Sequence, residues 1–110
     1  MSTTEIIAIQ QEMTVGQPSP SQIADFRVRL AGYYASSTDE FGELEMYRAR
    51  EWERFRKDSK SAADAERAFE ASEQGQRYLK LKHTLRKLEK LMSACGSKLR
   101  TAENEARGNY

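Results

Sequence analysis

The sequence predicts an all-α fold: a long antiparallel helical hairpin, coiled-coil-like, preceded by a short N-terminal helix. Three observations predict it. Both prolines lie early, at Pro18 and Pro20, so nothing in the later chain forbids helix. Apolar residues then recur at spacings of three and four. Charged residues make up 32% of the 110 and apolar residues 38%, a balance typical of long helices that expose most of their surface.

The first expected element is a short helix within residues 1–19, a segment separate from the hairpin. Thr3 or Thr4 is its expected cap, and the apolar residues on one side are Ile6, Ile9 and Met13. A helix this short is unstable alone, so we expect it to dock or fray. The stretch VGQPSP, residues 15–20, is the expected linker to a hairpin domain over residues 20–110.

The second expected helix runs from about residue 20 to residue 57. Ser19 and Gln22 form a capping box around Pro20, which suits the first helical position. Its apolar residues include Ile23, Phe26, Leu30, Phe41, Leu44, Tyr47, Trp52 and Phe55. The polar stretch 36–39 predicts a bend rather than an end.

The third expected helix follows a turn over residues 57–60. Ser61 with Asp64 forms its cap, and we expect it to continue to about residue 106, weakened but not ended by Gly75. Its heptad seam consists of Tyr78, Leu81, Leu85, Leu88, Met92, Cys95, Leu99 and Ala102. Because a hairpin buries little apolar surface, we expect a homodimer or a higher homo-oligomer.

The basic residues are unevenly distributed. Between Arg77 and Arg100 there are eight Lys/Arg and one acid, Glu89, although the whole chain has a net charge of only +1. Helical geometry places Lys80, His83, Lys87 and Lys90 opposite the leucine seam.

Three interpretations of this stripe remain open. In the first, it is a solvated face that is partly paired with the acidic stretch near residue 40. In an antiparallel hairpin that stretch lies opposite residue 78, so the charge pairs select the register of the two helices. In the second, it contacts nucleic-acid phosphates. In the third, it docks an acidic protein.

The residues that could carry chemistry are few. One cysteine, Cys95, and one histidine, His83, exclude multi-cysteine metal sites and leave no catalytic set, no zinc spacing and no phosphate loop. We therefore expect no enzyme activity, no metal and no cofactor. The apolar runs are also too short for a membrane span, and one unpaired cysteine fits a reducing, cytoplasmic setting.

The last fifty residues resemble a known group of proteins. The stretches AADAERAFEA, YLKLKHTLRKLEKLMSACGSKLR and NEAR are similar to small helical proteins from the early regions of tailed bacteriophages, often encoded near recombination genes. The resemblance covers residues 61–107, with weaker similarity over 20–56. It implies a phage or prophage origin, in the host cytoplasm, and an accessory role in recombination, replication or counter-defence. No catalytic residues carry over from it.

These observations lead to one expected function and two alternatives. The chain is expected to bind a host or phage protein without catalysis. The expected partner-binding residues are Trp52, Arg77, Lys80, His83, Arg86, Lys87 and Lys90. The alternatives are a nucleic-acid-binding accessory factor that uses the same basic stripe and a structural coiled-coil scaffold.

Overall fold

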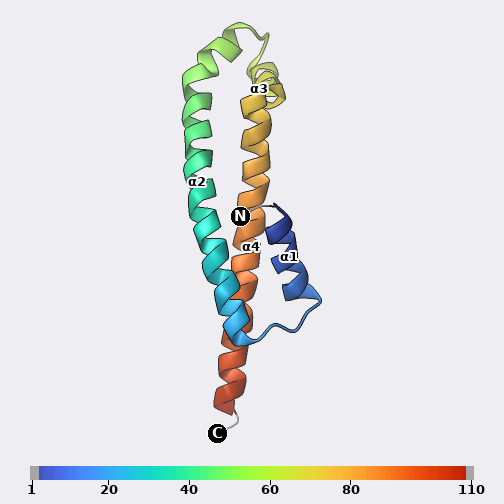
Figure 1. The fold of residues 1–110 in the computed structure, drawn as a ribbon. Coiled ribbons are helices and arrows are strands. Elements are labelled where there is room, and N and C mark those ends of the chain that lie inside the picture. The colour runs from blue at the N-terminus through green and yellow to red at the C-terminus, as the bar shows by residue number, and fades with distance from the viewer. Residues whose placement is uncertain (1–2, 109–110) are drawn as a thin grey trace. The chain divides into compact units, whose positions relative to one another are not determined.

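The computed structural model describes residues 3–108 and confirms the all-α fold (Figure 1). The helices are α1 (Thr3–Thr14), α2 (Pro20–Lys57), α3 (Ala62–Ala71) and α4 (Glu73–Gly108), and residues 3–108 contain no strand. No helix in this range is long and apolar enough to cross a membrane.

Two of the predicted helix starts are confirmed by their hydrogen bonds. The Ser19 N–H donates to Gln22 Oε1 at 2.8 Å, and the Gln22 N–H donates to Ser19 Oγ at 3.2 Å, which is the predicted capping box. Ser61 caps α3 with a single hydrogen bond, because its hydroxyl accepts from the Asp64 N–H at 3.1 Å. The predicted cap of α1 is wrong, since that helix already includes Thr3.

The predicted extent of the second helix is confirmed, because α2 continues without interruption through residues 36–39. The bend expected there stays a prediction. Ser37 within this polar stretch is buried, with 3% of its surface exposed. A short polar stretch therefore does not end a helix when the flanking turns carry apolar residues that pack.

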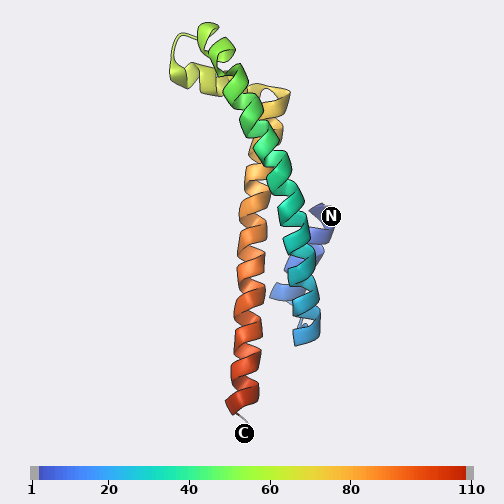
Figure 2. The same ribbon diagram turned by 90° about the vertical axis from the view of Figure 1, so that its left-hand side faces the viewer.

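The predicted continuity of the last helix is wrong, because the chain breaks at Ser72. Ser72 has an extended backbone conformation (φ −71°, ψ 162°) that ends α3, and its hydroxyl accepts from the Gly75 N–H at 3.0 Å to begin α4. A Cβ atom at Gly75 would lie 1.7 Å from the Phe69 carbonyl oxygen, so only glycine fits. As a result, α3 lies across the direction of the first turns of α4 (Figure 2).

Contacts between Cα atoms group the chain into two compact units. Unit 1 comprises residues 1–35 and 86–110, and unit 2 comprises residues 36–85. These units describe packing and not independent folding, so the expected domain boundary near residue 20 remains a prediction.

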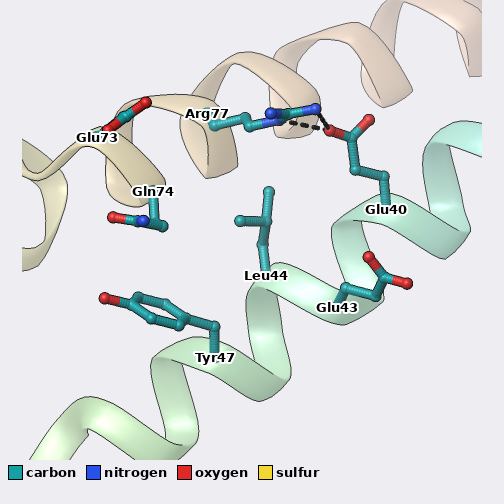
Figure 3. A pocket seen from close by; sticks show the side chains of 7 residues that line it. All are labelled: Glu40, Glu43, Leu44, Tyr47, Glu73, Gln74 and Arg77. Carbon is teal, nitrogen blue, oxygen red and sulfur yellow. Dashed lines mark hydrogen bonds and ion pairs between the residues drawn. The ribbon is translucent and has the colours of Figure 1, made fainter.

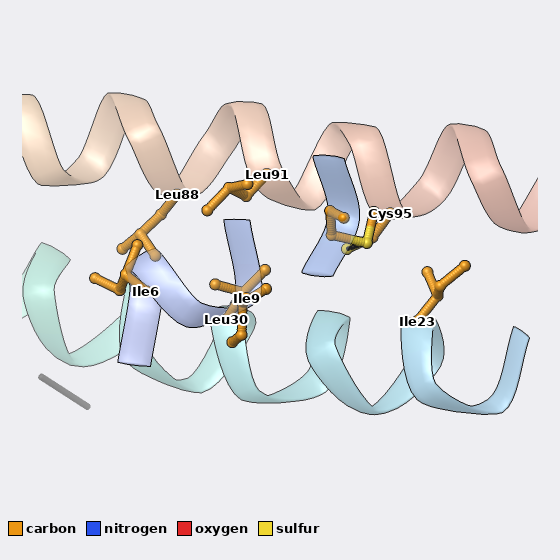
Figure 4. Close-up of a cluster of buried hydrophobic side chains, with 8 residues drawn as sticks. Ile6, Ile9, Ile23, Leu30, Leu88, Leu91 and Cys95 are labelled. Carbon is orange, nitrogen blue, oxygen red and sulfur yellow. Dashed lines mark hydrogen bonds between the residues drawn. The ribbon is translucent and has the colours of Figure 1, made fainter. Parts of the chain in front are cut away.

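Unit 1 has an aliphatic core built by α1 and by segments of α2 and α4. Its buried members are Ile6, Ile9, Met13, Ile23, Leu30, Leu88, Leu91 and Cys95 (Figure 4). The predicted side of α1 is confirmed, and the helix docks rather than frays. The Lys98 Nζ also donates to the Met13 carbonyl oxygen at 2.6 Å, which satisfies an unpaired carbonyl at the C-terminal end of α1.

Unit 2 is built around aromatic rings. Phe69 is 1% exposed, and its ring makes edge contacts with Phe55 (5.8 Å between centroids) and Tyr78 (5.7 Å). The Phe41 ring stacks on Tyr78 at 4.7 Å, which confirms that positions near 40 lie opposite positions near 78. The α2 and α4 segments of this unit therefore run antiparallel, as predicted.

Candidate functional site: the basic residues of α4

The predicted basic residues lie on the exposed surface of α4. Lys80, His83, Arg86, Lys87 and Lys90 are all exposed, as is Arg77 near the start of the helix. Arg77, Lys80 and His83 belong to unit 2, whereas Arg86, Lys87 and Lys90 belong to unit 1.

Arg77 is occupied by a partner within its own unit. Its guanidinium forms an ion pair with Glu40 of α2 (Figure 3). The neighbouring carboxylate of Glu43 and the Tyr47 ring line the same shallow depression. At this position the basic residue therefore acts as the register-setting interpretation predicts.

The unit 1 cations Arg86, Lys87 and Lys90, called here the cationic triplet, differ from Arg77. None of the three forms an ion pair with a residue in the range 3–108. The one acid in this stretch, Glu89, accepts a hydrogen bond from the Tyr34 hydroxyl at 2.8 Å. The cationic triplet therefore presents three charges to solvent without a counter-ion among the described residues.

Trp52 is half-buried, and the Arg48 guanidinium lies near its ring. The Cζ atom of Arg48 lies 5.8 Å from the Trp52 ring centroid, 5.4 Å from that of Phe69 and 5.9 Å from that of Tyr78. The guanidinium also forms an ion pair with Glu66. A hollow of about 290 Å³ is lined by Trp52, Arg48, Ala49 and Glu45.

Sequence reasoning missed Arg48 as the centre of this cluster. The only signal was the alternation of basic and aromatic residues in YRAREWERFRK, which does not indicate which arginine turns toward the rings. Cation–π contacts with three rings and an ion pair make Arg48 a structural residue of unit 2. Its Nε is buried and has no hydrogen-bond partner among the described residues.

Cys95 and His83 occupy opposite kinds of environment. Cys95 is fully buried, and its Sγ lies 3.9 Å from the Met13 Sδ. Burial raises the pKa of the Cys95 thiol, and the charges of Arg27 and Lys98 lower it by less. The thiol thus stays protonated and out of contact with solvent, as its seam position predicted, whereas His83 is exposed.

Comparison of the chain with family models, with curated proteins and with solved structures gave no match. Within residues 3–108, no group of three or more His, Cys, Asp or Glu side chains is arranged to hold a metal ion.

Proposed function

We propose that this chain is a non-enzymatic binding protein whose cationic triplet, Arg86, Lys87 and Lys90, docks an acidic protein. The observation that carries the proposal is that three exposed cations, none with an ion pair in the described range, lie within five consecutive residues of α4. Arginines elsewhere, such as Arg29, Arg48 and Arg77, are paired with carboxylates of the chain itself. Unpaired surface cations attract a complementary acidic surface and orient it.

The charge balance of unit 1 favours an acidic protein over nucleic acid. Unit 1 contains eight Lys/Arg and six Asp/Glu, so its field is weakly positive. Non-specific binding to a polyanion depends on neutralising many phosphates at once. An acidic protein segment with a few carboxylates needs fewer cations and matches the cationic triplet better.

The expected biological setting forms part of the same proposal. A phage accessory role in recombination, replication or counter-defence, in the cytoplasm of the host, fits a small helical protein that binds another protein. We also propose that the chain self-associates, because a helical hairpin buries little apolar surface and a second copy would cover more of it.

The test compares the cationic triplet with three matched cations. Arg86→Glu/Lys87→Glu/Lys90→Glu is compared with Arg50→Glu/Lys57→Glu/Lys60→Glu, which changes the net charge equally at exposed residues that have no ion pair in the described range. The probe is a fluorescein-labelled poly-glutamate peptide, read by anisotropy, with poly-glutamine as the negative peptide. Circular dichroism checks that both variants remain helical.

We expect the triplet reversal to weaken poly-glutamate binding by at least about tenfold, since three exposed charge pairs contribute about 0.5 kcal/mol each. The matched reversal is expected to change it by less than about threefold. Equal binding by the wild type and the triplet variant would contradict the proposal. Oligo-dT that binds more tightly than the peptide, with affinity falling steeply as salt increases, would favour the nucleic-acid alternative instead.

A further inference from the structure

Unit 1 contains a second basic feature that the stripe on α4 does not include. A shallow hollow of about 270 Å³ lies between α2 and α4 and is lined by Arg27, Met92, Ser93, Gly96 and Arg100. Two of its five lining residues carry guanidinium groups, one from each helix. We call it the Arg27–Arg100 hollow.

The Arg27 guanidinium lies close to α4 at Gly96. A Cβ atom built at Gly96 would lie 3.8 Å from both Cζ and Nη2 of Arg27, which is van der Waals distance. The guanidinium therefore lies directly over the small residue and near the α4 backbone. Its charge also reaches the adjacent buried thiol, because Arg27 lowers the pKa of Cys95 against the larger effect of burial.

Neither guanidinium of the hollow has a carboxylate partner in the described range 3–108. Arg27 forms no ion pair there, and Arg100 makes only a 3.5 Å hydrogen bond from Nη2 to the Ser97 hydroxyl. Arg29, two residues after Arg27, shows the usual arrangement, since it pairs with Glu5 and Asp25. Two like charges that line one hollow repel each other, and an anion between them would relieve that repulsion.

We propose that the Arg27–Arg100 hollow binds one carboxylate side chain of the acidic partner. The planar fork of a guanidinium matches the two oxygens of a carboxylate, and Arg27 and Arg100 each bring one such fork to the hollow. This inference rests on the proposed function, because the partner that brings the carboxylate is the one held by the cationic triplet.

The first test keeps the charge and removes the fork. Arg27→Lys/Arg100→Lys is compared with Arg50→Lys/Arg107→Lys, which makes the same change at two exposed residues without ion pairs in the described range. We expect about fivefold weaker poly-glutamate binding for the first pair, because lysine cannot bind a carboxylate bidentately. No change is expected for the second pair.

A second variant fills the hollow without altering any charge. Gly96→Met adds a side chain whose Cβ already contacts the Arg27 guanidinium and whose remaining atoms occupy part of the hollow. It also improves the helix propensity of α4, so the protein should fold. It is expected to weaken poly-glutamate binding as much as the lysine pair. Unchanged binding by both Arg27→Lys/Arg100→Lys and Gly96→Met would overturn the carboxylate site.

The outcomes separate this inference from the proposed function. If the triplet reversal abolishes binding while the lysine pair does not, the hollow is wrong and the cationic triplet stands. If the lysine pair weakens binding while the triplet reversal does not, the hollow binds carboxylate by itself and the proposed role of the cationic triplet is wrong. If the lysine pair weakens only oligo-dT binding, the hollow takes phosphate, and the carboxylate assignment is wrong.

Discussion

Units 1 and 2 are built from the same two long helices, but different side chains hold them together. Unit 1 encloses aliphatic residues such as Leu30 and Leu88, and α1 covers them. Unit 2 encloses the rings of Phe41, Phe69 and Tyr78, with the Arg48 guanidinium among them. An aliphatic core follows directly from heptad spacing, whereas an aromatic cluster with a cation depends on contacts that spacing does not specify.

The ion pairs of the two units can also be compared. In unit 2, Arg48 and Arg77 reach carboxylates on a facing helix and so help to hold that unit's helices in register. In unit 1, the cationic triplet and the two arginines of the hollow have no such partner in the described range. Each unit also contains the other kind, since Arg29 of unit 1 is paired, whereas Arg50, Lys57 and Lys60 of unit 2 have no ion pair in the described range. The binding proposals concern unit 1 because three of its unpaired cations lie within residues 86–90.

The largest expected effect comes from removing the central ring of unit 2. Phe69→Ala should destabilise the protein by about 3–5 kcal/mol, because it deletes a buried side chain, leaves a cavity and removes two ring contacts. Val28→Ala is the control, since Val28 is 72% exposed and its loss should cost less than about 0.5 kcal/mol. Chemical denaturation measures both. A small effect at Phe69 would mean that the rings do not form the centre of unit 2.

The next effect concerns the break between α3 and α4. Gly75→Ala should destabilise the protein by at least about 2 kcal/mol, since the new Cβ would overlap the Phe69 carbonyl oxygen. Gly32→Ala is the matched control within a helix, because a Cβ there meets no atom within 4 Å. It should stabilise the protein by about 0.5–1 kcal/mol through helix propensity. Equal stabilisation by both variants would show that α3 and α4 form one continuous helix.

A smaller effect is expected where α1 meets α4. Lys98→Met removes the hydrogen bond to the Met13 carbonyl and should cost about 1 kcal/mol. Hydrogen exchange over residues 3–14 should accelerate more than exchange over 62–71, because the bond holds only α1. Uniform acceleration across both helices would contradict a local role for Lys98.

The smallest effect is a pH dependence from Cys95. Because burial raises the pKa of this thiol, the folded chain keeps a proton that the unfolded chain loses above about pH 9. Stability should be unaffected by this group below pH 9 and should decrease as the pH rises further, by at most about 1.4 kcal/mol per pH unit. Cys95→Ala should lack this component. The same alkaline decline in both proteins would assign it to other groups.

Much of the fold could be predicted because its signals are local. The Ser19 and Ser61 caps, the buried side of α1 and the burial of Leu88 and Cys95 follow from residue types at fixed spacings. The break at Ser72 could not be predicted, because Ser-x-x-Gly within a strongly helical stretch is compatible with a continuous helix. The break follows from the packing of Phe69 in the unit 2 core, which is not a local signal.

The candidate site likewise has features that the sequence predicts and features that it does not. Spacing along α4 placed Lys87 and Lys90 on its exposed side correctly. It could not show that Arg77 is occupied by Glu40, or that Arg27 approaches Gly96 from 69 positions earlier in the chain. Both facts depend on which residues of α2 face α4, and that register emerges only from the packed helices.

The inside–outside assignment of α4 is tested most directly by thiol reactivity. Native Cys95 is compared with a single thiol placed at the cationic triplet, Lys90→Cys/Cys95→Ala, by reaction with a chromogenic disulfide reagent. The buried Cys95 should react at least about 100-fold more slowly than the exposed thiol, a ratio that corresponds to about 2.7 kcal/mol of protection. Similar rates for the two thiols in the folded protein would mean that the leucine seam faces solvent.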